Sequence, residues 1–145
     1  MSHDDVRSAH TLKASQITSE ATFELWRERV FAAGWHLSLD GLDVAAGCAR
    51  PFVLHPGHLD EPLVWTRDAG GALRCLSNVC THRANLVCTS DGPTRSLRCG
   101  YHGRTFELDG RLRSAPGFED AAAFPAARDD LRAAPGASEF DSSPA

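Results

Sequence analysis

The stretch NVCTHRANLVCTSDGPTRSLRCGYHG, residues 78–103, decides how this chain folds. It contains Cys80-Thr81-His82 near its start and Cys99-Gly100-Tyr101-His102 near its end, with sixteen residues between the two motifs. Two short apolar runs joined by the turn Asp91-Gly92-Pro93 fill the interval. A hairpin there would fold back and bring the two cysteine–histidine pairs side by side. Two sulfur and two nitrogen ligands would then converge on one spot.

The mixture of ligands in each motif bears on the kind of metal site. Zinc accepts two cysteines and two histidines, but its usual spacing opens with two closely spaced cysteines. Here each loop supplies one cysteine and one histidine. A binuclear iron–sulfur centre of the Rieske type uses this mixture, because one iron takes two thiolates and the other takes two imidazoles. The pattern favours such an electron-transfer centre on Cys80, His82, Cys99 and His102. A zinc-bound interaction module stays open as an alternative of another class.

Composition limits the remaining functions. The 145 residues suit one compact domain, and 42% hydrophobic residues suffice for a modest core. A formal net charge of −4 without a basic face argues against a nucleic-acid partner, and no apolar run is long enough for a membrane span. The acidic N-terminus does not resemble a secretory signal. Five cysteines form a poor disulfide framework, so we expect reduced, metal-binding thiols in a cytoplasmic protein.

One helix is expected before the β-rich region. Residues 1–17 are polar and predict a flexible N-terminus, and the helix is expected over 18–34. Thr18 or Ser19 can cap it, and Gly34 can end it. Apolar residues recur at helical spacing between these ends, which predicts a packing helix: Phe23, Trp26, Val30 and Phe31.

Short runs of β-forming residues then predict an all-β fold over residues 35–132. The expected strands are 35–39, 52–55, 63–67, 73–79, 86–88, 97–99 and 105–108, with turns at 68–71, 91–93 and 109–110. Close spacing of short strands favours an antiparallel sandwich or small barrel that carries the ligand loops as a subdomain. Residues 114–135 predict a loop with one helical turn near 121–127, and residues 133–145 predict a disordered tail.

Several other residues invite a structural interpretation. Cys75 and Cys88 are expected to be buried thiols, and no partner is implied for Cys48. Core or interface positions are expected for the tryptophans Trp26, Trp35 and Trp65. The stretch 55–60, with two histidines and an aspartate, predicts a surface turn more than a metal site. Arg83 and Arg104 are either solvated or positioned to dock an acidic reductase.

Two stretches, residues 78–83 and 99–103, resemble the two cluster-binding loops of Rieske proteins. The likeness is greatest to the Rieske domain of ring-hydroxylating-type oxygenase α subunits and runs from about residue 23 to 131. Ala33-Gly34-Trp35 resembles their N-terminal region, and Ala115-Pro116-Gly117 resembles their loop that covers the cluster. The resemblance implies one [2Fe–2S] cluster per chain on the four ligands. It also implies a mono- or dioxygenase component, with a flavin reductase or ferredoxin as electron donor and an oxygenase catalytic domain as acceptor.

The same resemblance bears on the reduction potential. High-potential Rieske proteins carry an extra cysteine in each loop, joined as a disulfide, where this chain has Asn85 and Tyr101. They also carry a serine and a tyrosine that hydrogen-bond the cluster, where this chain has Arg104 and Phe106. Fewer donors leave the added electron less stabilised. We expect a potential in the lower part of the range of about −150 to +300 mV.

The catalytic part of the implied family is not visible in this sequence. Rieske oxygenases hold a mononuclear iron on two histidines and a carboxylate in a following domain, and no histidine follows His102 here. We therefore expect that the chain alone is not catalytically complete. It is either part of an oxygenase α subunit or a stand-alone carrier of the Rieske ferredoxin type.

Overall fold

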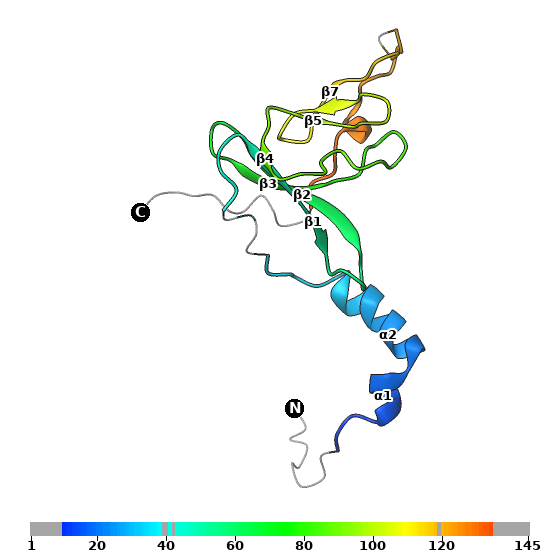
Figure 1. Cartoon of the computed structure of the whole chain (residues 1–145). Helices are drawn as coiled ribbons and strands as arrows, with labels where there is room; N and C mark the ends of the chain where they lie inside the picture. The colour runs from blue at the N-terminus through cyan, green and yellow to red at the C-terminus, as the bar shows by residue number, and fades with distance from the viewer. Residues whose placement is uncertain (1–9, 39–40, 42, 119, 135–145) are drawn as a thin grey trace, which may run out of the picture. The chain divides into compact units, whose positions relative to one another are not determined.

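The computed structural model describes residues 10–38, 41, 43–118 and 120–134, and the chain divides into two units, 1–36 and 37–145. We describe each unit by itself, and Figure 1 shows the elements of both. Part of the predicted flexible N-terminus, residues 1–9, and most of the predicted disordered tail, residues 135–145, lie outside the described residues.

The first unit is helical. α1 (Ala14–Thr18) is followed by α2 (Glu20–Trp26) and a turn of π-helix, η2 (Arg27–Phe31). Ser19 separates α1 from α2 and caps α2 by accepting a hydrogen bond from the Thr22 N–H at 3.4 Å. The three helices bury no residue, so the packing expected of the helix over 18–34 is not found within this unit. No helix among the described residues is long and apolar enough to cross a membrane.

The second unit contains a four-stranded antiparallel sheet with strand order β3-β2-β1-β4. Its strands are β1 (Cys48–Leu54), β2 (Glu61–Arg67), β3 (Leu73–Ser77) and β4 (Gly92–Pro93). β4 pairs only with Cys48 and Ala49, which leaves the rest of β1 as an edge. Pro51 is tolerated in β1 because its missing N–H falls on that edge, beyond the end of β4.

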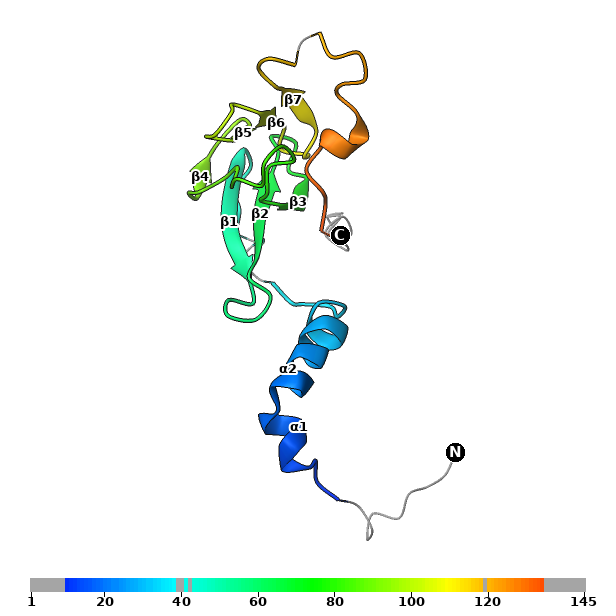
Figure 2. The same ribbon diagram turned by 90° about the vertical axis from the view of Figure 1, so that its right-hand side faces the viewer.

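A smaller antiparallel sheet carries the second ligand loop. It has the order β5-β6-β7, with β5 (Leu97–Arg98), β6 (Thr105–Phe106) and β7 (Leu112–Ser114). Figures 1 and 2 both place this sheet at one end of the larger one, with the segment after β7 running out beyond it. A 3₁₀ turn, η3 (Ala127–Asp129), closes that segment. The predicted all-β fold with little helix is confirmed.

The alternation of side chains along β2 and β3 creates two hydrophobic clusters on opposite faces of the larger sheet. One face adds Val64 and Leu76 to a cluster that includes Phe106, Cys80 and Cys99. The other face contributes Leu63, Trp65, Leu73 and Cys75 to a second cluster with Val44. Thr66 is fully buried and donates a hydrogen bond to the Leu108 carbonyl at 2.7 Å, which joins β2 to the segment after β6. The cysteines of the two motifs therefore belong to the main core.

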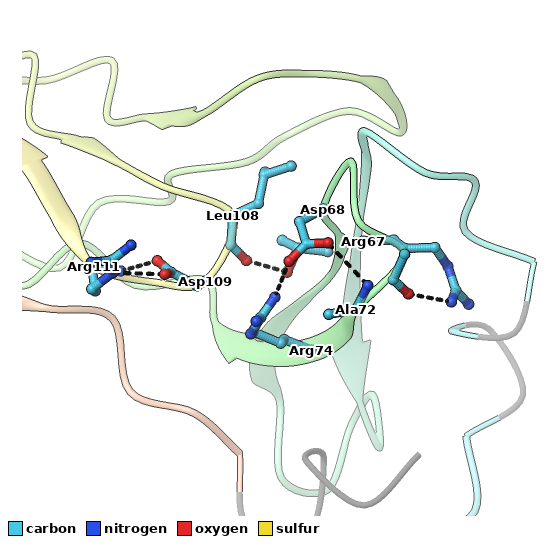
Figure 3. Close-up of polar contacts among 9 residues, drawn as sticks. Arg67, Asp68, Ala72, Arg74, Leu108, Asp109 and Arg111 are labelled. Carbon is cyan, nitrogen blue, oxygen red and sulfur yellow. Dashed lines mark hydrogen bonds and ion pairs between the residues drawn. The ribbon is translucent and has the colours of Figure 1, made fainter. Parts of the chain in front are cut away.

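Polar contacts at the β2–β3 turn fix the register of that hairpin (Figure 3). The Asp68 carboxylate accepts from the Ala72 N–H at 3.0 Å and from the Arg74 guanidinium at 2.8 Å. Arg67 donates to the Val44 carbonyl at 2.6 Å, which attaches the end of β2 to the segment that precedes β1. The turns predicted at 68–71 and 109–110 are confirmed.

Some strand boundaries differ from the prediction. Residues 35–38 form no strand, and residues 86–88 form only an isolated bridge between Val79 and Leu86. Gly92–Pro93, expected in a turn, pairs with the start of β1 as the short strand β4. β7 was not predicted, and its pairing with β6 contains a register shift. These differences arise because strand pairing depends on distant partners, which residue preference does not reveal.

Candidate metal centre

The two ligand motifs fold into loops of the same design. In the first loop the Cys80 N–H donates to the Asn85 carbonyl at 2.8 Å and the Ala84 N–H donates to the Cys80 carbonyl at 3.0 Å. In the second loop the Cys99 N–H donates to the Arg104 carbonyl at 2.8 Å and the Gly103 N–H donates to the Cys99 carbonyl at 3.1 Å. Ala84 and Gly103 both take a positive φ, 53° and 77°, which closes each loop tightly.

The cysteine of each loop lies at its buried base. Cys80 and Cys99 are 3% and 2% exposed, and their side chains hydrogen-bond each other. Backbone groups of the next residues point at each sulfur: His82 and Arg83 at Cys80, and Tyr101 and His102 at Cys99. Such donors stabilise a thiolate, the form that binds metal.

Burial and hydrogen bonds shift the pKa values of the two thiols. Burial first, and then the neighbouring Cys99, raise the pKa of Cys80 above its usual value. Burial also opposes ionisation of Cys99, but the hydrogen bonds from Tyr101, His102, Cys80 and Asn85 outweigh burial and lower the pKa of Cys99.

The imidazoles lie together on the outer side of the loops. The ring centroids of His82 and His102 are 4.7 Å apart, at an interplanar angle of 62°. Tyr101 stacks on His102 with centroids 3.9 Å apart and is itself 59% exposed. Burial, then His102, Arg104 and Arg83, lower the pKa of His82, which favours the neutral imidazole that metals bind.

The four side chains thus form a buried sulfur pair and an outer imidazole pair. In the part of the chain that the structure describes, no three or more His, Cys, Asp or Glu side chains gather around a single ion site. In a [2Fe–2S] centre of the Rieske type, the two cysteines bind one iron and the two histidines bind the other. The donor set and its division into pairs fit this cofactor.

Two asparagines support the loops. Asn78 is 2% exposed, donates to the Cys88 carbonyl at 2.7 Å and accepts from the Cys88 N–H at 2.8 Å. Asn85 donates to the Cys99 sulfur at 3.7 Å. Sequence reasoning assigned neither role, and it counted Asn85 only as a position without cysteine. Their place inside the motif was the available signal, because short polar side chains in tight loops commonly bond backbone groups.

The segment 115–130, of which the structure describes all residues but Glu119, has residues that contact both loops. The Pro116 ring is 3.4 Å from the point that a methyl group on Gly103 would occupy. Phe118 makes an edge contact with His82, with ring centroids 5.8 Å apart. These contacts agree with the expectation that the proline-containing loop covers the site.

The interpretation of Arg104 as a solvated surface residue is wrong, whereas Arg83 is exposed. Arg104 is 5% exposed because segment 115–130 covers it. Its guanidinium carbon lies 5.4 Å from the Phe118 ring centroid and 5.2 Å from the Phe124 ring centroid.

The remaining candidates fall outside the site. Cys75 and Cys88 are buried as expected, all five cysteines are free, and Cys48 is half-buried. Trp65 belongs to the core, whereas Trp26 and Trp35 are 43% and 85% exposed. Residues 55–59 form the predicted turn, in which His58 and Leu59 donate backbone hydrogen bonds to the His55 carbonyl.

Comparison with known proteins agrees with this geometry. A model of the Rieske [2Fe-2S] domain matches residues 53–125. The N,N-dimethyl phenylurea N-demethylase subunit alpha of Sphingobium sp. strain YBL2 is 35% identical over 103 residues, or 70% of this chain and 22% of that protein. The biphenyl 2,3-dioxygenase subunit alpha of Rhodococcus jostii strain RHA1 is 34% identical over 112 residues, or 77% of this chain and 23% of that protein.

A solved structure extends the likeness to the backbone. The apo form of the quaternary ammonium Rieske monooxygenase CntA superposes with a TM-score of 0.74 at 26% identity, over 85% of this chain and 35% of that one. The chain therefore spans about a third or less of the length of these proteins. The family match over residues 53–125 shows that the chain belongs to the Rieske [2Fe–2S] domain family.

Proposed function

We propose that this chain is the electron-transfer domain of a Rieske non-haem iron oxygenase α subunit, and that oxygen activation takes place in a separate catalytic domain. The observation that carries the proposal is the pair of matching loops, which separate a buried sulfur pair from an outer imidazole pair. The oxygenase subunits among the relatives support this assignment.

In this proposal Cys80 and Cys99 hold one iron, and His82 and His102 hold the other. When bound, the cluster supplies reversible uptake of one electron. The backbone donors at each sulfur favour the thiolates, and the lowered pKa of His82 favours the neutral imidazole. Asn78 holds the base of the first loop, so that the ligands keep their positions when charge is added.

The outer side of the loops is the proposed face for electron exchange. His102 and Tyr101 are exposed there, and Arg83 adds a positive charge. We propose a flavin reductase or a ferredoxin as electron donor and the oxygenase catalytic domain as acceptor. An acidic donor surface would complement Arg83. Five free cysteines and an iron–sulfur site support a cytoplasmic location.

Iron and acid-labile sulfide analysis of the purified 145-residue chain tests the proposal, together with visible absorption and EPR after reduction. We expect two irons and two sulfides per chain, which corresponds to about one [2Fe–2S] cluster per chain. Cys99→Ser and His102→Ala should abolish or alter the cluster. Cys48→Ser and His58→Ala are matched controls outside the two loops and should leave its spectrum unchanged. Zinc without sulfide would overturn the proposal in favour of the interaction module.

A stand-alone carrier of the Rieske ferredoxin type is the second candidate. Residues 37–145 form a compact unit, and both described hydrophobic clusters belong to it, as a small carrier requires. The DNA that follows the coding sequence distinguishes the two. An in-frame continuation with a histidine pair and a carboxylate favours the α subunit, and a stop codon beside a separate oxygenase gene favours the carrier.

A further inference from the structure

Arg104 carries a buried positive charge. It is not one of the four proposed ligands, and it does not belong to either hydrophobic cluster. Its side chain is 6% exposed, and its nearest carboxylate, Asp129, lies at 3.6 Å. One terminal nitrogen donates to the Thr81 hydroxyl at 3.1 Å. Nε has no hydrogen-bond partner in the described part of the chain. The guanidinium is therefore held with incomplete hydrogen bonding beside a pair of aromatic rings, Phe118 and Phe124, whose centroids are 5.1 Å apart.

The position of Arg104 links it to both ligand loops. Its backbone carbonyl accepts the N–H of Cys99 at 2.8 Å and so closes the second loop. Its side chain reaches Thr81, the residue between Cys80 and His82 in the first loop. One residue thus fixes the spacing of the two loops relative to each other.

The same side chain fastens the covering segment. The Thr81 hydroxyl donates to the Asp129 carbonyl at 2.7 Å, and the Asp129 carboxylate accepts from the Ala126 N–H at 2.9 Å. Phe118 and Phe124 lie beside the guanidinium. The network of buried Arg104 with half-buried Thr81 and Asp129 therefore joins three segments that meet around the ligands.

The charge of Arg104 has an effect beyond packing. A guanidinium stays protonated at any pH at which the protein folds. In buried surroundings the charge is screened far less than at the surface. Asp129 neutralises it only in part, because the 3.6 Å separation is long for an ion pair with a shared hydrogen bond. A residual positive potential beside the ligands favours the form of the centre that carries the additional electron.

We propose that Arg104 is a positioning residue that clamps the two ligand loops to segment 115–130 and raises the reduction potential of the cluster they hold. The proposal rests on the cluster assignment made above. The positive charge of Arg104 would offset in part the low reduction potential expected from the missing hydroxyl donors at positions 104 and 106. Arg104 and Asp129 should then act on the potential in opposite directions.

Potentiometric titration of the cluster-loaded chain, followed by EPR, tests this. Arg104→Met should lower the ratio of reduced to oxidised cluster at a fixed ambient potential by about tenfold, equivalent to a fall of about 59 mV. Asp129→Asn should raise that ratio. Arg104→Lys keeps the charge and should stay within about threefold of the wild type, whereas a purely structural clamp would lose the guanidinium contacts to Thr81 and Asp129 in both Arg104 variants alike.

Arg95→Met is the matched control, because Arg95 is exposed outside both ligand loops and solvent screens its charge. Its ratio should change by less than about threefold. If Arg104→Met does not retain the cluster, Asp129→Asn and Arg104→Lys decide the question. If the loaded wild type, Asp129→Asn and every loaded Arg104 variant have the same reduction potential, the role of Arg104 is overturned. The proposed function is not affected by that result. A wild-type chain that assembles no cluster overturns the proposed function as well.

Discussion

Replacement of Asn78 by alanine should destabilise the first ligand loop strongly. The Asn78 amide makes two buried hydrogen bonds, to the Cys88 carbonyl at 2.7 Å and from the Cys88 N–H at 2.8 Å. Alanine leaves both backbone groups unpaired, at a cost of about 1–3 kcal/mol each, so the free energy of unfolding should fall by about 2–6 kcal/mol. For a domain of about 100 residues this corresponds to a drop in Tm of at least about 8 °C.

Thermal unfolding followed by far-UV circular dichroism and by the visible absorption of the cluster measures this effect. The two signals should be lost together, and at lower temperature than in the wild type, because the hairpin of residues 78–88 carries Cys80 and His82. Thr89→Ala is the matched control: it changes an exposed residue next to Cys88 and should shift Tm by about 1–2 °C or less. A Tm of Asn78→Ala equal to that of the control would refute the assigned role of the Asn78 amide.

Two further predictions concern groups away from the loops. Burial raises the pKa of Cys75 to about 12, so iodoacetamide at pH 8 should modify half-buried Cys48 much faster than Cys75 in the folded chain, as read by mass spectrometry. Equal rates would contradict the buried thiol. The hydrogen bond from Arg74 lowers the pKa of Asp68, so the carboxylate stabilises the fold above its unfolded pKa of about 3.9 and loses this effect as pH falls through the lower folded value. Asp68→Asn should therefore reduce stability by at most about 1 kcal/mol at pH 7, and the difference from wild type in urea unfolding should vanish toward pH 2; a difference that persists there would contradict the carboxylate's role.

The sequence predicted that the two cysteines lie together and that the two histidines lie together, because each cysteine–histidine pair is local. Each cysteine and its histidine share one short loop, and the residue that closes the loop, Ala84 or Gly103, follows the histidine within two positions. Residue type and spacing therefore carried most of the information. The burial of Cys75 could also be predicted, since alternation along one strand places its side chain on a buried face.

The environment of the ligands could not be predicted in the same way. Arg104 reads as a surface residue because its burial depends on Phe118 and Phe124, which follow it by more than a dozen residues in a segment without regular structure. β4 was missed for a related reason. Gly92–Pro93 has turn chemistry and becomes a strand only because β1 lies beside it. Tertiary contact overrode local preference in both cases.

The interpretation of the potential changes for the same reason. The sequence shows which hydroxyl donors of high-potential relatives are missing, but it does not show that Asn85 donates to the Cys99 sulfur. Nor does it show that a guanidinium is buried beside the loops. Both features stabilise added negative charge, so we expect a potential that remains low for the class without lying at its lower limit.

Pulsed EPR of the reduced chain, grown with ¹⁵N-labelled histidine, tests the central assignment most directly. Two histidine nitrogens coupled to a rhombic cluster signal are predicted, with one coupling lost in His82→Ala or His102→Ala if a cluster remains. A signal without histidine nitrogen coupling, or with coupling unchanged in both variants, would contradict the division into a cysteine-bound and a histidine-bound iron.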